Sequence, residues 1–303
     1  MHTDFITSFA CSRDGSLVAT GQQGHQPFVS IWSTKTCETL IILPEIQQNA
    51  ISCMCFSPNN QLIAIVSLDK DHTISIYDWS MRVCISKSYG GCKRILGIYF
   101  NDINTNDGTN VGLGLISYGD HEIRFWKNIS TRFPSSIRPV LGENGSMQNF
   151  LSGAQFMDQS VVGSCDGYIY VFRDEAFLLK VKAHTGPLTA MDVCYSKKQL
   201  VTGGKDGSIR LWTIDYTCLK EFVLESILES HNTNVRSVAF NTHGTHLVVG
   251  TRAAEICELS IDEDTRVRGK SLVDAHAIRQ LWGLASHPTK EECITSGDDC
   301  TIR

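Results

Sequence analysis

A motif that runs from Ala183 to Trp212 and recurs along the chain limits the possible folds more than any other feature. It opens with Ala183-His184, continues as an apolar stretch through Val193, and ends in Leu200–Trp212, which contains the turn Lys205-Asp206-Gly207. Short apolar runs broken by Gly and Asp are typical of strands joined by tight turns. Asp-Gly favours a hairpin because Gly tolerates a positive φ. The motif therefore predicts a set of short antiparallel strands.

Each copy of the motif closes on an aromatic or large apolar residue, at Trp32, Tyr77, Trp126, Phe172, Trp212 and Leu259. Successive positions are 40 to 49 residues apart, close to the ~40–45-residue period of a WD-repeat blade. Apolar segments begin successive copies at Phe5–Cys11, Ile51–Phe56, Val235–Phe240 and Leu281–Ala285. We predict an all-β fold, a WD-repeat β-propeller of about seven four-stranded blades whose last blade is incomplete.

The repeat divides residues 1–303 into seven approximate units, at 1–47, 48–90, 91–148, 149–181, 182–229, 230–273 and a truncated 274–303. The closing aromatic of the seventh unit would fall at about position 305 by this register. We therefore expect the sequence to be a fragment of a larger protein, with its units in one ring or across two. Residues 101–110 and 128–148, rich in Asn, Gly, Ser and Pro, are predicted to be exposed loops.

Composition excludes several classes of function. A formal net charge of −5 argues against a general nucleic-acid binder and a polybasic membrane-surface protein. No apolar run reaches the ~18 residues of a membrane span, and the N-terminus lacks the pattern of a signal peptide. The 12 cysteines lie mostly in apolar stretches without a CxxC pair. We expect them to be buried structural thiols in a reducing compartment.

One polar set recurs with the repeat. In WD repeats a His, a Ser or Thr, an Asp and a Trp form one hydrogen-bonded group, and the complete copy here is His184, Thr202, Asp206 and Trp212. Partial copies are His276, Thr295 and Asp299, and His2, Thr20 and Trp32. A hydrolase triad would use similar residue types. Because a catalytic site is assembled once whereas this set repeats, the pattern favours a structural polar network.

Other patterns give weaker alternatives. Gly203-Gly204-Lys205 lacks the spacing of a phosphate-binding loop. Asp298 and Asp299, together with Asp69 or Asp120, allow a calcium site, although aspartates in turns more often cap their own backbone. We therefore predict no catalytic residues, no cofactor-binding residues and no metal site.

Longer segments resemble a particular family. Residues 280–288, Gln-Leu-Trp-Gly-Leu-Ala-Ser-His-Pro, resemble the E-L-W-G-L-A-x-H-P signature of the echinoderm microtubule-associated protein-like family. Residues 17–32 are similar to its A-T-G-Q…P-x-V-x-I-W segment, and residues 74–79 to its V-x-I-W-D-W strand. The resemblance is colinear over nearly the whole chain and looks closest to the longer, multi-propeller members. It implies association with tubulin or microtubules in the cytoplasm, as part of the cytoskeleton.

We therefore predict a non-catalytic, microtubule-associated scaffold that binds tubulin and other proteins, without a cofactor, nucleic acid, membrane or small-molecule substrate. The alternative is a WD-repeat adaptor of another assembly, such as a ciliary complex or a ubiquitin-ligase substrate receptor. An enzyme that uses the central channel of the propeller is a third class. Tubulin is acidic, so exposed cations near strand ends are the candidate contacts: Arg13, Lys35, Lys93, Arg94, Arg252 and Arg279.

Overall fold

The structure is a computed structural model that describes residues 2–43, 49–91, 93–104, 111–228, 233–253, 255–261, 270–274, 281–286 and 293–297. For residues 102–104, 111–112 and those from 270 onward it describes only the backbone. Contacts divide the chain into two compact units, residues 1–164 with 170–180, and residues 165–169 with 181–303.

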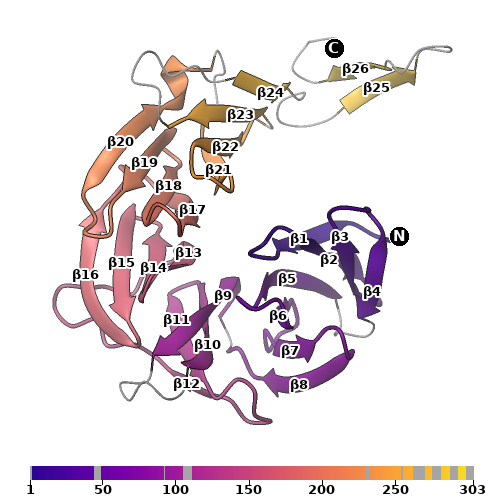
Figure 1. The fold of residues 1–303 in the computed structure, drawn as a ribbon, viewed down its shortest axis with the longest axis vertical. Coiled ribbons are helices and arrows are strands. Elements are labelled where there is room, and N and C mark those ends of the chain that lie inside the picture. The colour runs from indigo at the N-terminus through magenta and orange to yellow at the C-terminus, as the bar shows by residue number, and fades with distance from the viewer. Residues whose placement is uncertain are drawn as a thin grey trace. The chain divides into compact units, whose positions relative to one another are not determined.

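The described chain is almost entirely β-strand, arranged in successive antiparallel sheets (Figure 1). The first sheets are formed by β1 (Ile6–Cys11), β2 (Leu17–Gly24), β3 (Val29–Ser33) and β4 (Thr39–Leu43); by β5 (Asn49–Phe56), β6 (Leu62–Ser67), β7 (Ile74–Asp78) and β8 (Val83–Ser88); and by β9 (Ile95–Asn104), β10 (Val111–Gly119), β11 (Glu122–Lys127) and β12 (Ser135–Ile137). Pairing between the ends of β2 and β5 joins the first two into one eight-stranded sheet.

The later sheets follow the same order. They are formed by β13 (Phe150–Phe156), β14 (Gln159–Ser164), β15 (Tyr168–Arg173) and β16 (Ala176–Lys182); by β17 (Leu188–Cys194), β18 (Gln199–Gly204), β19 (Ser208–Trp212) and β20 (Cys218–Val223); and by β21 (Val235–Phe240), β22 (His246–Thr251), β23 (Glu255–Ser260) and β24 (Lys270–Asp274). A short 3-10 helix (Leu224–Ser226) follows β20, and β25 (Leu281–Ser286) pairs with β26 (Cys293–Gly297).

These sheets confirm the predicted all-β fold of four-stranded propeller blades, with two strands described in the last one. We number the blades 1 to 7 in chain order. The predicted strands that open blades 1, 2, 6 and 7 are β1, β5, β21 and β25, within two residues at either end. The boundaries of the seven units, and their membership of one ring or two, stay predictions.

Strand register explains why the closing aromatic residue recurs. Trp32 pairs with Val18, Trp126 with Leu115 and Trp212 with Leu200, so each tryptophan occupies the same place on its third strand. Side chains two residues apart on a strand share one face. Each indole is therefore on the same face as the Ser or Thr two residues beyond its partner, which positions the polar networks.

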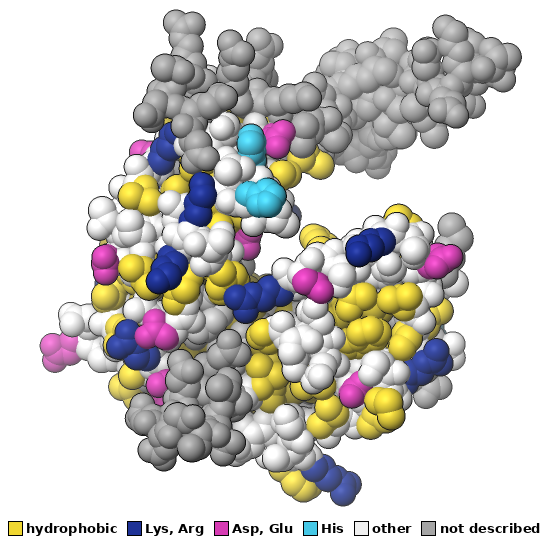
Figure 2. All heavy atoms as spheres, viewed as in Figure 1, with side chains coloured by type: hydrophobic (Ala, Val, Ile, Leu, Met, Phe, Trp, Pro, Cys, Tyr) yellow, Lys and Arg dark blue, Asp and Glu magenta, His cyan; other side chains and the backbone are white. Residues whose placement is uncertain are grey.

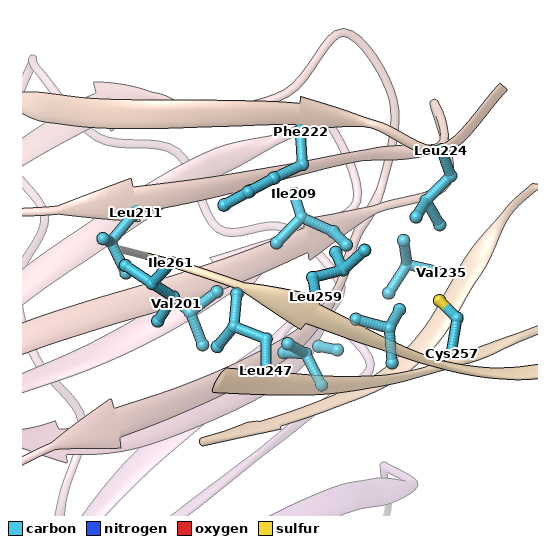
Figure 3. Close-up of a cluster of buried hydrophobic side chains, with 13 residues drawn as sticks. Val201, Ile209, Leu211, Phe222, Leu224, Val235, Leu247, Cys257, Leu259 and Ile261 are labelled. Carbon is cyan, nitrogen blue, oxygen red and sulfur yellow. The ribbon is translucent and has the colours of Figure 1, made fainter. Parts of the chain in front are cut away.

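The hydrophobic core lies between neighbouring sheets. In the second unit, side chains from β18–β20 point toward those of β21–β23 (Figure 3), and Val201, Ile209, Val235 and Leu247 have no exposed surface. In the first unit, one cluster joins β1–β4 to β5–β8 and another joins β5–β8 to β9–β12. Burying such a side chain contributes about 1.5–3 kcal/mol. A strand between two such layers is apolar on both faces, which accounts for the near-continuous apolar runs.

The two predicted exposed loops are partly wrong. Residues 101–104 belong to β9, where Asn101 pairs with Gly114 and is buried; residues 105–110 lie outside the described residues. Within residues 128–148, β12 pairs with β11, and Ile129 is 1% exposed in the core cluster of blades 2 and 3. Strand β11 needs an outer partner, and this segment supplies it despite a loop-like composition.

The prediction of buried cysteines holds for only some of them. Of the nine cysteines described, Cys194 and Cys257 are buried, four are half-buried, and Cys11, Cys37 and Cys218 are exposed. All nine are free thiols. Burial raises the pKa of Cys53 to about 12, so this thiol is protonated at neutral pH. The exposed three lie at the end of β1, in the β3–β4 turn and at the start of β20.

Candidate functional site

Blade 5 holds the complete polar network. His184 precedes β17 and has no exposed surface. Its Nε2 lies 2.9 Å from Thr202 Oγ1 on β18, and Trp212 Nε1 on β19 donates to the same oxygen at 2.9 Å. His184 Nδ1 lies 3.1 Å from Asp206 Oδ1 in the β18–β19 turn. Because an ionised carboxylate only accepts, His184 Nδ1 donates to Asp206 Oδ1, and Ser208 Oγ lies 2.9 Å from the same nitrogen. The structure thus brings all four predicted side chains together.

Asp206 connects the network to two backbone segments. It accepts from the backbone N–H of Thr185 at 2.9 Å and of Ser208 at 3.1 Å. Partial burial of its carboxyl acts to raise the pKa, but hydrogen bonds and attraction from His184, with those from Thr185 and Ser208, outweigh it. The pKa of Asp206 therefore lies well below its usual value, and the carboxylate is charged at neutral pH.

Blade 1 carries a second network that the sequence indicated only in part. His2 Nε2 lies 2.6 Å from Thr20 Oγ1, and Trp32 Nε1 donates to that oxygen at 2.7 Å. The place of the aspartate is taken by Gln22, whose Oε1 lies 2.9 Å from His2 Nδ1 and accepts from Thr3 N–H at 3.1 Å. The sequence pattern did not single out Gln22, because Gln23 and Gln26 lie close to it along the chain and only the fold shows which amide faces His2.

Blade 3 keeps one link of the network, a hydrogen bond from Trp126 Nε1 to Ser117 Oγ at 2.9 Å. The predicted partial copy in the last blade has not been placed. His276 and Asp299 lie outside the described residues, and of Thr295 only the backbone, in β26, is described.

The geometry of blade 5 offers a substrate no access to its hydroxyl group. His184 and Thr202 both have no exposed surface, and the Thr202 oxygen is already engaged by two partners. A nucleophilic triad needs a hydroxyl that a substrate carbonyl can reach. For the calcium alternative, the carboxylate of Asp69 accepts from the backbone and hydroxyl groups of Thr73, which is the turn-capping arrangement. The described residues contain no group of three or more potential metal ligands.

The candidate partner-binding cations divide between opposite ends of the blades. Because β2 and β5 pair antiparallel through Gly24 and Asn49, the β2–β3 turn and the start of β5 lie at one end. Four antiparallel strands return the chain to that end, which we call the β5-start end, and there Lys93 and Arg94 connect β8 to β9. Arg13 and Lys35 lie in the β1–β2 and β3–β4 turns, at the opposite end.

All four of these side chains are exposed, as is Arg252 in the β22–β23 turn of the second unit; Arg279 lies outside the described residues. Lys93 Nζ donates to the carbonyl of His121 at 3.2 Å. On the face shown in Figure 2, Lys and Arg side chains lie apart from one another rather than in one continuous patch.

The β5-start end has further cations beside Lys93 and Arg94. The buried carboxylate of Glu122 accepts from Arg124 Nε at 2.7 Å and from Arg138 Nε at 2.8 Å. Arg124 and Arg138 thus share one carboxylate, and with Lys93 and Arg94 they place four cations at this end, beside the carboxyl groups of Glu122 and Asp120. The predicted contacts at the β5-start end therefore have two further cations, Arg124 and Arg138, as neighbours.

A family model described as the echinoderm microtubule-associated protein first β-propeller matches residues 1–259. The chain belongs to this family. The fold of this EML-type propeller is also similar to that of a solved structure, the crystal structure of the Cps50 (Swd1) β-propeller domain of Myceliophteria thermophila. That likeness has a TM-score of 0.73 at 13% identity and covers 100% of this chain and 98% of the other.

Curated relatives of this EML-type propeller include the 77 kDa echinoderm microtubule-associated protein of Lytechinus variegatus, 26% identical over 99% of the chain and 45% of the relative. Echinoderm microtubule-associated protein-like 2 of Homo sapiens is 27% identical over 98% and 46%. Centriole proteome protein 16 of Chlamydomonas reinhardtii is 23% identical over 86% and 13%. The chain spans less than half the length of these relatives. None of its described helices is long and apolar enough to cross a membrane.

Proposed function

We propose that this EML-type propeller is a non-catalytic scaffold that associates with microtubules in the cytoplasm by binding tubulin. The observation that carries the proposal is the family match over residues 1–259, together with relatives named as microtubule-associated proteins over nearly the full chain. The proposal includes other protein partners and the structural role of the polar networks. It excludes nucleic acid and membrane as partners, which the net charge of −5 supports.

Charge limits how such binding would work. A chain with net charge −5 gains nothing from bulk attraction to an acidic surface. Binding would therefore depend on a local basic region, and the surroundings of Lys93 and Arg94, with Arg124 and Arg138 on Glu122, are the best candidate. Contacts of exposed charges are screened by salt, so the affinity should fall as ionic strength rises.

Co-sedimentation of the 303-residue chain with taxol-stabilised microtubules, at two salt concentrations, tests the proposal. We expect the protein to pellet with microtubules at low salt and to be released at high salt. If the folded chain stays in the supernatant at both salt concentrations, this propeller does not bind the lattice.

One observation favours the alternative, an adaptor of a ciliary assembly. The relative from Chlamydomonas reinhardtii is named a centriole proteome protein, and it matches 86% of the chain. Affinity capture with the 303-residue chain distinguishes the two functions. The sample is a soluble protein extract of purified axonemes from which tubulin has been removed. Saturable capture of a defined non-tubulin subunit, with no pelleting on microtubules, would support the adaptor.

A further inference from the structure

Blade 2 has a groove along its outer edge. The groove has a volume of about 500 Å³ and is lined by Cys84–Lys87 of β8 and by Arg132 and Phe133, which lie between β11 and β12. All of these residues belong to the first unit. None of them belongs to the polar networks or to the candidate contacts for tubulin.

Strand β8 ends the hydrogen-bonded order of its sheet, so one side of its backbone has no partner among the described strands (Figure 1). An open edge of this kind pairs with an extended segment from another chain. The register of β8 shifts between its contacts with Ile76 and Tyr77, which leaves Ile85 as an extra residue on the β8 side. The groove thus offers backbone donors and acceptors beside a hollow that can receive side chains.

The charged side chains that line the groove favour an acidic partner. Lys87 and Arg132 are the charged residues among those described to line it, and both are cationic and exposed. Carboxylates in a partner would be attracted to them, whereas cationic groups would be repelled. Since the chain as a whole has a net charge of −5, this local positive charge is a property of the groove.

Phe133 adds an apolar anchor. Its side chain is 82% exposed, and the guanidinium of Arg132 lies 5.7 Å from its ring centroid. At the near end of β8, Val83 is 52% exposed and Met81, in the preceding turn, is 71% exposed. Phe133 lines the groove itself, whereas Val83 and Met81 are exposed apolar groups at the start of β8 and in the turn before it.

We propose that the β8 groove binds an extended, acidic peptide segment of a partner protein, which adds as a strand to β8 and places an aromatic or aliphatic side chain against Phe133. The carboxylates of the peptide pair with Lys87 and Arg132. This inference does not depend on microtubule binding, because it uses different residues and a different ligand.

Selection of random twelve-residue peptides displayed on phage against the 303-residue chain tests the inference. We expect enriched peptides to contain at least two acidic residues and one aromatic or β-branched residue. Their affinity should fall at least tenfold on Arg132→Glu/Phe133→Ala. A matched control, Lys35→Glu/Phe5→Ala, removes the same kinds of exposed group from blade 1 and should leave the affinity unchanged.

Two further measurements keep the result interpretable. Lys87→Glu should lower the affinity of the chain for the peptides, and it provides a test if the double variant proves unstable. Melting temperatures equal to that of the unsubstituted chain would show that the variants fold. Two versions of a peptide, N-methylated at one or the other set of alternate amides, each block one edge; the version whose methyl groups face β8 cannot pair with it and should bind at least tenfold more weakly. Enrichment of basic peptides, no enrichment, or affinity that survives both groove variants would overturn the proposal.

Discussion

At the scale of single residues, one threonine hydroxyl in each network contacts both a histidine ring nitrogen and the indole N–H of a tryptophan. The two hydroxyls nevertheless differ in burial. Thr202 has no exposed surface, whereas Thr20 is half-buried. Thr202→Val would leave His184 Nε2 and Trp212 Nε1 without their shared partner in the core, and we expect it to lower the free energy of unfolding by about 2–4 kcal/mol. Thr20→Val should lower it by about 1 kcal/mol or less, because water can replace the lost bond. Urea denaturation followed by tryptophan fluorescence measures both, with the exposed Thr36→Val as a control; equal losses at 20 and 202 would contradict the assignment.

A pH dependence follows from the charge of Asp206. Its pKa is lowered in the folded state, so its stabilising effect is present above the unfolded pKa of about 3.9 and is lost as the pH falls below that value. We expect Asp206→Asn to lower the free energy of unfolding by about 1–3 kcal/mol at pH 7, and the difference from the unsubstituted chain to shrink between pH 5 and 2. Gln22→Ala is the matched control, because the amide does not titrate and its effect should stay constant over that range. A constant difference for Asp206→Asn would refute the role of its carboxylate.

At the scale of elements, close approach of blades 5 and 6 depends on a glycine in β18. A Cβ added at Gly203 would lie 2.4 Å from Cγ1 and 3.1 Å from Cβ of the fully buried Val235 on β21. Gly203→Ala must therefore push the two strands apart, and we expect it to lower the free energy of unfolding by about 1–3 kcal/mol. Gly21 repeats the arrangement against Ile51 between blades 1 and 2, so the same substitution there should have a similar effect.

Gly186→Ala provides the control for this prediction. Its added Cβ would have no neighbour closer than 3.9 Å, so its stability should change little. Thermal unfolding of the three alanine variants makes the comparison. If Gly203→Ala and Gly186→Ala behaved alike, the contact between β18 and β21 would not limit the spacing of these blades.

At the scale of the whole molecule, the candidate cations form two sets rather than one rim. A protein that contacts tubulin through a local region should use one end of blades 1 to 3. We expect Lys93→Glu/Arg94→Glu to weaken co-sedimentation at low salt at least tenfold, or about 1.4 kcal/mol, because it reverses charge at the β5-start end. Arg13→Glu/Lys35→Glu applies the same change in charge at the opposite end and should leave binding unchanged. An equal loss of co-sedimentation in the two variants would mean that net charge, not a local contact, governs binding. Both variants must have the same melting temperature as the unsubstituted chain for this comparison.

The sequence by itself determined the fold of the blades and four members of the complete polar network, to which the structure adds Ser208. Strands and tight turns depend on neighbours along the chain, so the spacing of apolar runs, Asp-Gly and the closing aromatic predicted four-stranded blades. His184 and Thr202 lie 18 residues apart, as do His2 and Thr20, because a hairpin of fixed length separates them. The tryptophan then follows from strand register. Local chemistry was enough for each of these.

Tertiary structure alone decided the features that depend on contacts between distant segments. Gln22 stands in for an aspartate because its longer side chain reaches His2 across the blade, and Ile129 is buried because the core between blades 2 and 3 has room for it. The exposure of Cys11 depends on which sheet faces cover it. The groove beside β8 exists because Arg132 and Phe133 lie next to a strand more than forty residues away in the sequence. Burial, access and charge surroundings are set by how sheets pack, and packing is a property of the folded molecule that spacing along a chain does not encode.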